Sequence, residues 1–276
     1  MLPYLRLGPL LLQTPGLAIL VGLWLGMTAA EKEAKRTHLN PAHIYNFLLV
    51  GLLSGIVGAR LAYASQYLSI YLENPLSLFA LNLNTLAPFE GFLIGLAAAG
   101  LYLARRKLPL RPVLDTLTPG LAIFFVALGV SHILSGQAYG METQVPWSIF
   151  LWGEYRHPTQ FYETLAALLI LVVIWLRPLR SPGAGLNFLL FVSLTALARI
   201  FTEAFRADSS IIGDFRSAQV AGLVILALSL LLLHRWMKSP TPYVPESVVT
   251  EEDPPPGETD SPDRGPSLQD SVERNL

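Results

Sequence analysis

The sequence contains no cysteine among its 276 residues. This absence excludes a disulfide framework, a thiolate nucleophile and any metal site that needs cysteine ligands. Charged side chains are also scarce, at 14% of residues, whereas soluble domains average about 25%. Hydrophobic residues make up 52% of the chain, and the mean hydropathy is +0.47. Together these values indicate an integral membrane protein.

The net charge of −1 averages two unlike parts of the chain. Residues 239–276 carry nine acidic side chains and two basic ones, with many prolines and serines, and this composition predicts a disordered, acidic, proline-rich tail. Residues 1–238, the expected transmembrane domain, carry a net charge of +6. Their basic residues lie mostly at the ends of apolar segments, so we expect no nucleic-acid partner. No spacing of His, Asp or Glu indicates a metal, and we expect no cofactor.

Seven apolar segments approach the roughly 20 residues that a helix needs to cross a bilayer. The sequence therefore predicts an all-α membrane protein with seven transmembrane helices. The segments are Leu10–Ala30, Ile44–Tyr67, Phe89–Ala104, Leu114–Ser135, Gln160–Leu176, Ala184–Phe205 and Ala218–His234. We expect the first segment to be retained as a span, because its basic residues follow it, the reverse of a secretory signal.

Basic residues favour the cytoplasmic flanks of membrane helices. Eleven of them follow the first, third, fifth and seventh segments: Lys32, Lys35, Arg36, Arg105, Arg106, Lys107, Arg111, Arg177, Arg180, Arg235 and Lys238. Only four lie on the other side: Arg6, Arg156, Arg206 and Arg216. We therefore expect the N-terminus outside and the C-terminal tail in the cytoplasm. The two long outer loops, at about residues 68–88 and 136–159, are apolar or aromatic, which favours contact with the outer headgroups.

On this topology the ionisable residues of five spans gather in the outer half of the bilayer. They are Arg60, Glu90, His132, Glu163 beside Gln160, and Arg199 with Glu203, with Arg206 and Asp208 just beyond. Charge inside a bilayer is costly unless it is paired, hydrated or used. The one-sided placement predicts a polar cavity open to the outer leaflet.

Plainer interpretations stay open for these residues. Glu90 is also consistent with a rim glutamate that reaches water, and a lone His132 is more often a packed core residue than a base. Arg199 and Glu203 lie four residues apart on one helix face, which suits a structural ion pair. A phosphate suits a guanidinium group, but the charge balance does not require one. Four arginines are matched by four acidic residues: Arg60, Arg156, Arg199 and Arg206 by Glu90, Glu163, Glu203 and Asp208.

At these same residues the sequence resembles the prolipoprotein diacylglyceryl transferase family, bacterial membrane enzymes that lipidate lipoprotein precursors. The most specific match is Arg156-His157-Pro158-Thr159-Gln160-Phe161-Tyr162-Glu163, which is similar to the family's Arg-His-Pro-Ser-Gln-Leu-Tyr-Glu run. Three further matches are Phe89-Glu90-Gly91-Phe92-Leu93-Ile94-Gly95, Arg199-Ile200-Phe201-Thr202-Glu203-Ala204-Phe205-Arg206 and Gly58-Ala59-Arg60. The resemblance covers roughly residues 1–238. It implies a multi-pass protein of the bacterial cytoplasmic (inner) membrane.

The sequence also departs from the family's pattern. Glu90 stands where the family's signature histidine is expected. In the register of the family's Gly-Arg-x-Gly-Asn-x-x-Asn-Gly-Glu-x-x-Gly segment, Gly129 falls at the essential arginine, His132 at an asparagine and Gln137 at the glutamate. Gly140 is retained. Pro15 falls at a first-span tyrosine.

The resemblance implies transfer of a diacylglyceryl group from phosphatidylglycerol to the lipobox cysteine of a secreted prolipoprotein. The resemblance implies that Glu90 is the base that forms the thiolate, that Arg199 binds the phosphate, and that Glu203 orients Arg199. The substrate-binding residues it implies are Arg60, Gly91, His132, Gln137, Gly140, Arg156, Gln160, Glu163 and Arg206. The ordinary pKa of a glutamate, about 4.3, lies far below that of a thiol, about 8.5, so burial would have to raise the pKa of Glu90 for it to act as the base.

Two alternatives remain beside this interpretation. The first is a paralogue that keeps the fold and a lipid cavity but serves as a lipid-binding or complex-associated membrane subunit. The second is a transporter, for which an internal repeat or a mid-membrane charge would be expected.

Overall fold

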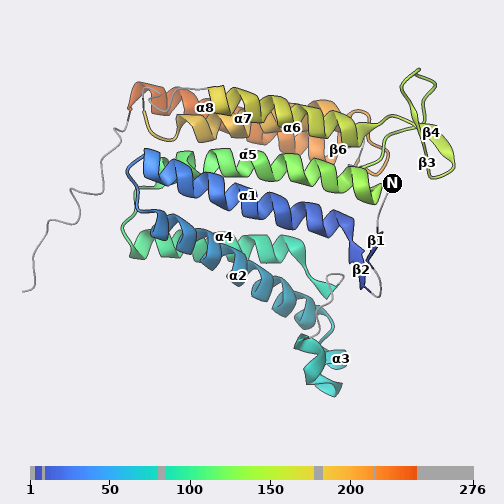
Figure 1. Cartoon of the computed structure of the whole chain (residues 1–276), viewed down its shortest axis with the longest axis horizontal. Coiled ribbons are helices and arrows are strands. Elements are labelled where there is room, and N and C mark those ends of the chain that lie inside the picture. Colours follow the sequence, from blue (N-terminus) through green and yellow to red (C-terminus); the bar gives the residue numbers. More distant parts are fainter. Residues whose placement is uncertain (1–3, 8–9, 80–84, 177–182, 214, 241–276) are drawn as a thin grey trace, which may run out of the picture.

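The computed structural model describes residues 4–7, 10–79, 85–176, 183–213 and 215–240. Its main body is a bundle of seven long helices (Figure 1). These are α1 (Thr14–Arg36), α2 (Pro41–Gln66), α4 (Pro88–Arg105), α5 (Leu110–Ser135), α6 (Thr159–Leu176), α7 (Leu186–Glu203) and α8 (Ser217–Lys238). Two short helices, α3 (Leu68–Glu73) and η1 (Pro75–Phe79), connect α2 to α4. Successive long helices run in alternating directions.

Local sequence signals explain where several helices begin and end. Proline stands in the first turn of α1, α2 and α4, where its missing N–H has no helical partner to lose. The side chain of Asn40 accepts a hydrogen bond from the backbone N–H of Ala42 at 2.9 Å and so caps α2. Gly136 ends α5 with a left-handed φ of 75°.

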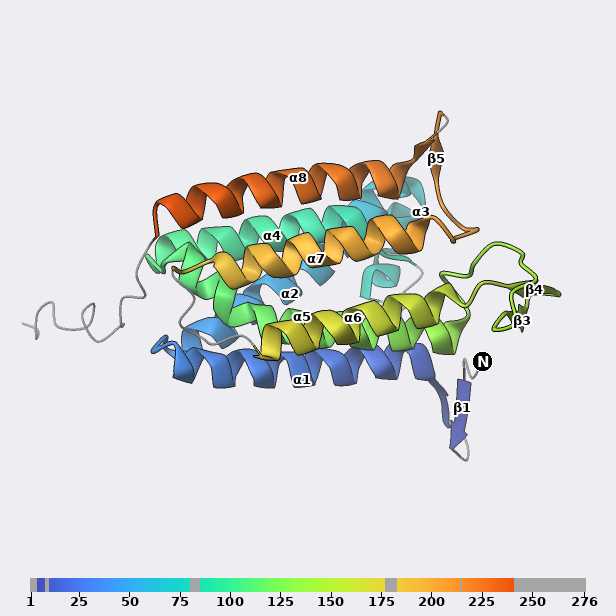
Figure 2. The same cartoon turned by 90° about the horizontal axis from the view of Figure 1, so that it is seen from above.

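Three two-stranded antiparallel hairpins lie at one end of the bundle, which we call the hairpin end (Figures 1 and 2). They pair β1 (Tyr4–Leu7) with β2 (Leu10–Gln13), β3 (Ile149–Leu151) with β4 (Glu154–Arg156), and β5 (Ile211–Ile212) with β6 (Phe215–Arg216). The sequence did not predict them. The first span was expected at Leu10–Ala30, but Leu10–Gln13 form a strand of the first hairpin, and the helix α1 begins at Thr14 and ends at Arg36.

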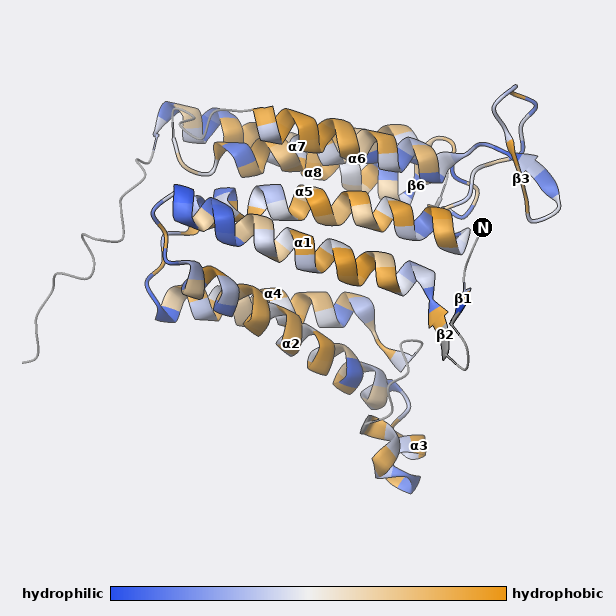
Figure 3. Ribbon diagram, in the orientation of Figure 1, coloured by the Kyte–Doolittle hydropathy of each residue, from blue (hydrophilic) through white to orange (hydrophobic). Residues whose placement is uncertain are grey.

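Six of the long helices are long and apolar enough to cross a membrane, which accords with an all-helical membrane protein. The exception among the described long helices is α4, which has 18 residues and carries Glu90 in its first turn and Arg105 in its last. Hydrophobic residues dominate the helices over most of their length (Figure 3). Only 11% of the most apolar window of α8 is buried in the chain. Such an exposed apolar surface needs an apolar solvent or a partner.

Small residues set the closest helix contacts. Gly26 of α1 lies against the backbone of Gly120 of α5, and Gly91 and Gly95 of α4 lie against Gly55 of α2. The helix pairs α1–α5, α2–α4, α5–α6 and α7–α8 are therefore side by side, and α1 also touches α2. The Gly91 and Gly95 face of α4 admits another helix closely. The bundle thus has an α2–α4 pair on one side and α5 to α8 on the other, with α1 between them (Figure 1).

At the opposite end, a buried carboxylate holds the start of α7. Asp115 of α5 is 4% exposed and accepts hydrogen bonds from the backbone N–H groups of Gly185 (2.7 Å) and Phe188 (2.9 Å). A carboxylate at a helix N-terminus satisfies unpaired N–H groups and opposes the helix dipole. Two of the basic residues used for the expected orientation, Arg177 and Arg180, lie outside the described residues, as does the expected tail from residue 241 on.

Candidate functional site

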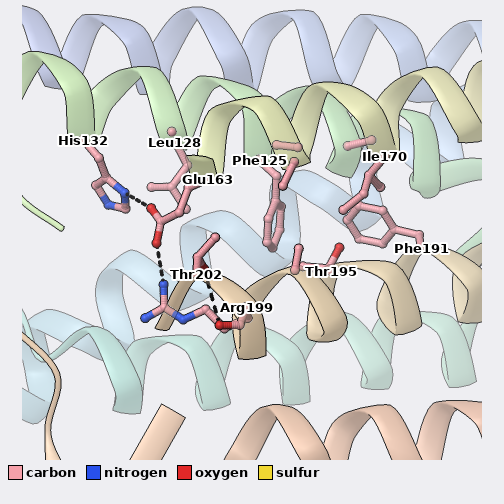
Figure 4. Close-up of a pocket in the computed structure, with 14 residues that line it drawn as sticks. Phe125, Leu128, His132, Glu163, Ile170, Phe191, Thr195, Arg199 and Thr202 are labelled. Carbon is pink, nitrogen blue, oxygen red and sulfur yellow. Dashed lines mark hydrogen bonds and ion pairs between the residues drawn. The ribbon is translucent and has the colours of Figure 1, made fainter. Parts of the chain in front are cut away.

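Glu163, in the first two turns of α6, accepts bonds from three cationic or imidazole side chains at the hairpin end. Its Oε2 atom lies 3.0 Å from Nδ1 of His132 on α5. Its Oε1 atom accepts from Nη1 of Arg199 on α7 at 2.9 Å and from Nη1 of Arg206 at 2.8 Å. Figure 4 shows the first two of these contacts. One carboxylate thus ties together α5, α6, α7 and the segment after α7.

Glu203 forms the second anionic centre. Its side chain is 1% exposed, with Oε2 3.0 Å from Nη2 of Arg199 and 3.8 Å from Nε of Arg206. The Arg199–Glu203 pair that the i,i+4 spacing allows is therefore present. Below we call His132, Glu163, Arg199, Glu203 and Arg206 the Glu163 cluster.

The charges of the Glu163 cluster are internally matched. Arg206 also makes two contacts with Asp208, at 2.9 and 3.0 Å. Burial works to lower the pKa of Arg206, but the carboxylates of Asp208 and Glu163 outweigh it and raise that pKa above its ordinary value. With Asp208 added to the two carboxylates of the cluster, three carboxylates face two guanidinium groups, so no surplus positive charge remains. An incoming anion has to compete for Arg199, whose side chain is 39% exposed.

A cavity of about 100 Å³ opens beside the cluster between α5, α6 and α7. His132, Glu163 and Arg199 form its polar end, and Figure 4 shows them on one side of the space. The remaining wall is mainly apolar and includes Phe125, Leu128, Ala166, Ile170, Phe191 and Thr195. This arrangement suits an amphiphilic ligand, with a polar group at the cluster and a hydrocarbon segment in the cavity.

Gly129 explains why α5 and α6 approach so closely at this point. A Cβ atom added there would lie 2.5 Å from Oγ1 and 3.0 Å from Cα of Thr164 on α6. His132 follows one turn later on α5, so the close approach brings its ring within reach of Glu163. The structure leaves no room at Gly129 for the arginine side chain of the family's pattern.

Arg60 contacts the connection between α2 and α4, and its role in binding substrate stays a prediction. Its guanidinium donates to the backbone oxygens of Leu78 (Nε, 2.9 Å), Ser77 (Nη2, 2.6 Å) and Thr85 (Nη1, 2.9 Å), and to the hydroxyl of Thr85. It also lies over the ring of Tyr71, 5.9 Å from the centroid. These contacts hold the connection between α2 and α4.

Glu90 shares the hairpin end with the Glu163 cluster but lies on the α2–α4 pair. Its Oε1 accepts a 3.3 Å hydrogen bond from Nε2 of Gln66, near the end of α2. The described residues form no hydrogen bond or ion pair that joins Glu90 to the cluster. Gly91 beside it is buried in the contact with Gly55 and Ala59.

Two further predicted site residues, Arg156 and Gly140, stabilise the segment between α5 and α6. Arg156 donates to the backbone oxygens of Leu151 (3.2 Å) and Gly140 (3.4 Å) and pairs with Glu142 at 3.4 Å. Gly140 packs so tightly on His157 that a Cβ would collide with it. Gln137 is exposed.

Gln160, a predicted substrate-binding residue, makes fewer side-chain contacts than expected, whereas Arg216, which was not predicted to belong to the site, makes more. Gln160 is fully buried, and both polar atoms of its side chain lack a hydrogen-bond partner among the described residues. Arg216 was expected only as an outer basic residue, yet its Nη1 donates to the backbone oxygens of Glu203 and Arg206. Nothing in the sequence around Arg216 signals that contact. No group of three His, Asp or Glu side chains is placed to hold a metal in the described part of the chain.

Comparison with known proteins gives one consistent result. The family model described as prolipoprotein diacylglyceryl transferase matches residues 3–235. The chain is similar to proteins named phosphatidylglycerol–prolipoprotein diacylglyceryl transferase from several bacteria. The Synechococcus elongatus protein is 29% identical, and the match covers 82% of this chain and 84% of the relative. The Clostridioides difficile protein is 28% identical, and the match covers 76% of this chain and 84% of the relative. That of a Nostoc species is 26% identical, over 87% and 91%.

Proposed function

We propose that this chain, which belongs to the prolipoprotein diacylglyceryl transferase family, transfers a diacylglyceryl group from phosphatidylglycerol to the lipobox cysteine of prolipoproteins. The names of its relatives and the span of the family match support this proposal. The observation in the fold that carries it is the half-exposed guanidinium of Arg199 at the polar end of an apolar cavity. A phospholipid offers the matching chemistry, with a phosphate next to hydrocarbon.

In this reaction a thiolate is the nucleophile. Its sulfur bonds to the terminal glycerol carbon of the diacylglyceryl group while the bond from that carbon to the phosphate oxygen breaks, and glycerol phosphate leaves. Arg199 stabilises the negative charge that grows on the departing phosphate. Glu203, 3.0 Å from Arg199, holds that side chain in position. Glu90 remains our sequence-based assignment for the base, although its bonded partner is Gln66 rather than a cluster residue.

The proposal includes a topology. The seven long helices are taken as seven crossings of the bacterial inner membrane, α4 included, with the N-terminus outside and the C-terminus in the cytoplasm. The eleven basic residues against four support this orientation, which turns the hairpin end and the cluster to the outer leaflet. Residues 1–238 form the transferase domain, and residues 239–276 form a disordered acidic tail in the cytoplasm.

One observation favours a second candidate, a paralogue that binds lipid or joins a membrane complex without catalysing transfer. Both arginines of the Glu163 cluster are already paired with carboxylates, so phosphate binding requires one of these pairs to open. A structural role needs no such opening.

A transfer assay separates the two candidates. The purified protein is incubated in bilayers with radiolabelled phosphatidylglycerol and a lipobox peptide, and label on the peptide is measured. We expect transfer by the wild type and a fall of about 10²–10³-fold for Arg199→Ala, the usual effect of removing a group that stabilises developing charge. Arg235→Ala, exposed at the far end of α8, is the matched control and should keep wild-type activity.

Absence of transfer by the wild type would favour the second candidate. Glu90→Gln is assayed beside it. If Glu90→Gln transfers at the wild-type rate, the assignment of Glu90 as base is wrong even though the activity stands.

A further inference from the structure

We propose that Nε2 of His132, with the ring oriented by Glu163, is the general base that removes the proton from the incoming cysteine thiol. This inference rests on the proposed transferase function and replaces Glu90, the base that the resemblance implies, with His132. It concerns a histidine that the sequence suggested only as a substrate contact.

The position of the His132 ring leaves one nitrogen available. Nδ1 is engaged by Glu163 Oε2 at 3.0 Å. Nε2 has no hydrogen-bond or ion-pair partner in the described part of the chain. The side chain is 22% exposed and lines the cavity between α5, α6 and α7. A substrate group at the polar end of that cavity therefore lies beside the imidazole ring.

The contacts of Glu163 fix which nitrogen carries the proton. Its Oε1 atom is held by Nη1 of Arg199 and Nη1 of Arg206, at 2.9 and 2.8 Å. The carboxylate cannot rotate without breaking both ion pairs, so Oε2 stays directed at His132. An ionised carboxylate only accepts hydrogen bonds, so the neutral imidazole has its proton on Nδ1 and a lone pair on Nε2.

His132 suits the proton transfer better than Glu90 does. Imidazole has an ordinary pKa of about 6.5, closer to a thiol at about 8.5 than a carboxylate at about 4.3, and proton transfer is most effective when the two are matched. Glu163 also joins His132 directly to Arg199. The thiolate would therefore form beside the guanidinium that receives the leaving phosphate, whereas Glu90 bonds to Gln66 of the α2–α4 pair.

The thiol proton passes to Nε2 of His132 and the thiolate sulfur attacks the terminal glycerol carbon. The carbon–oxygen bond to phosphate breaks with its electron pair on the oxygen, and Arg199 offsets the added charge. The proton then leaves the imidazolium for water or for the released glycerol phosphate, which restores the base.

Glu163 of α6 contacts His132 directly and links it to the other charged groups of the neighbouring elements. These are Arg199 and Glu203 from α7, and Arg206 and Asp208 after it. The first four turns of α1, which packs on α5, contribute no charged residue. A base must be unprotonated, so transfer that depends on an imidazole base should be lost at acidic pH.

The test measures transfer to a lipobox peptide against pH for wild type, His132→Asn, Glu90→Gln and the control His43→Asn. His43 is also half-buried, but lies at the start of α2 and contacts Tyr102. We expect His132→Asn to lower the turnover rate by about 10²–10⁴-fold, as general acid–base catalysis contributes, with little change in the apparent affinity for lipid. Transfer by this variant should depend on the thiol's own ionisation, near a pKa of about 8.5, so its rise should move to higher pH than in the wild type. Glu90→Gln should keep the wild-type pH profile. Added imidazole should restore part of the activity of His132→Ala.

A second measurement does not depend on turnover. Nitrogen-15 NMR of labelled histidine, with the His132 signal assigned by its loss in His132→Asn, should show the proton on Nδ1 in the wild type and a changed tautomer balance in Glu163→Gln. A proton on Nε2 in the wild type would overturn the inference. So would wild-type transfer that keeps its rate and pH profile in His132→Asn. No transfer by the wild type together with the Nδ1–H tautomer would instead overturn the proposed function, and the base assignment with it.

Discussion

The contact between α2 and α4 allows a sharp test with one added methyl group. Gly95 of α4 faces α2, and a Cβ atom there would lie 2.6 Å from the backbone oxygen of Gly51 and 3.2 Å from Cα of Gly55. Ordinary carbon–oxygen contacts begin near about 3.3 Å, so the two helices would have to separate by roughly 0.7 Å. Such overpacking costs about 1–3 kcal/mol. Gly95→Ala should therefore destabilise the protein by about that amount.

Gly100 provides the matched control on the same helix. A Cβ atom at Gly100 meets nothing within 4 Å, and alanine is favoured over glycine in a helix by roughly 0.5–1 kcal/mol. Gly100→Ala should thus be neutral or slightly stabilising. The free energy of unfolding is measured for both variants by denaturant titration in micelles, followed by circular dichroism. Equal stability of Gly95→Ala and Gly100→Ala would refute the close α2–α4 packing.

Three further perturbations follow from individual contacts. Arg60→Met removes the hydrogen-bond donors that hold the connection between α2 and α4. We expect the free energy of unfolding to fall by about 1–3 kcal/mol and chymotrypsin to cleave this connection faster. An unchanged cleavage rate would contradict this role of Arg60. Gly129→Leu should push α5 from α6 and lower the melting temperature, whereas Gly16→Ala, with open space around it, should not; equal melting temperatures would argue against the tight α5–α6 contact. Because the chain has no cysteine, Gln144→Cys and Ser239→Cys can be labelled alone in intact cells: an impermeant maleimide should modify only Gln144→Cys, and the opposite pattern would reverse the proposed orientation.

The sequence predicts the bounds of a helix well where a residue such as proline marks the end of an apolar run. The segment expected at Gln160–Leu176 is observed at Thr159–Leu176, directly after Pro158. The start of the chain was harder, because a short apolar run such as Leu10–Gln13 fits a strand as well as a helix. In the structure it pairs with Tyr4–Leu7.

The position of a polar residue along the membrane normal does not determine which other polar residues it contacts. The sequence placed Arg60, Glu90 and Arg199 at the same end of the bundle, and all three lie at the hairpin end. Depth fixes only one coordinate, however, and helix pairing decides the others. Arg60 and Glu90 belong to the α2–α4 pair, whereas Arg199 joins Glu163 across α6 and α7.

The approach of α5 to α6 at Gly129 has a similar origin. It depends on contact between residues far apart in the chain, so no local pattern reveals it. The same holds for the link between His132 and Glu163, 31 positions apart. The sequence places His132 and Glu163 at a similar depth in the bilayer, and it shows Gly129 only as a departure from the family's pattern, so neither contact could be predicted from it.

The most direct test of the proposed site is photo-crosslinking with a phosphatidylglycerol analogue that carries a photoactivatable acyl chain. Adducts are mapped by mass spectrometry, with unlabelled phosphatidylglycerol as competitor. We predict competed adducts on the cavity wall formed by α5, α6 and α7, near Phe125, Leu128 and Ile170, and their loss in Arg199→Ala. Adducts confined to α2 and α4, or adducts at the cavity that phosphatidylglycerol does not compete away, would contradict a lipid site at the Glu163 cluster.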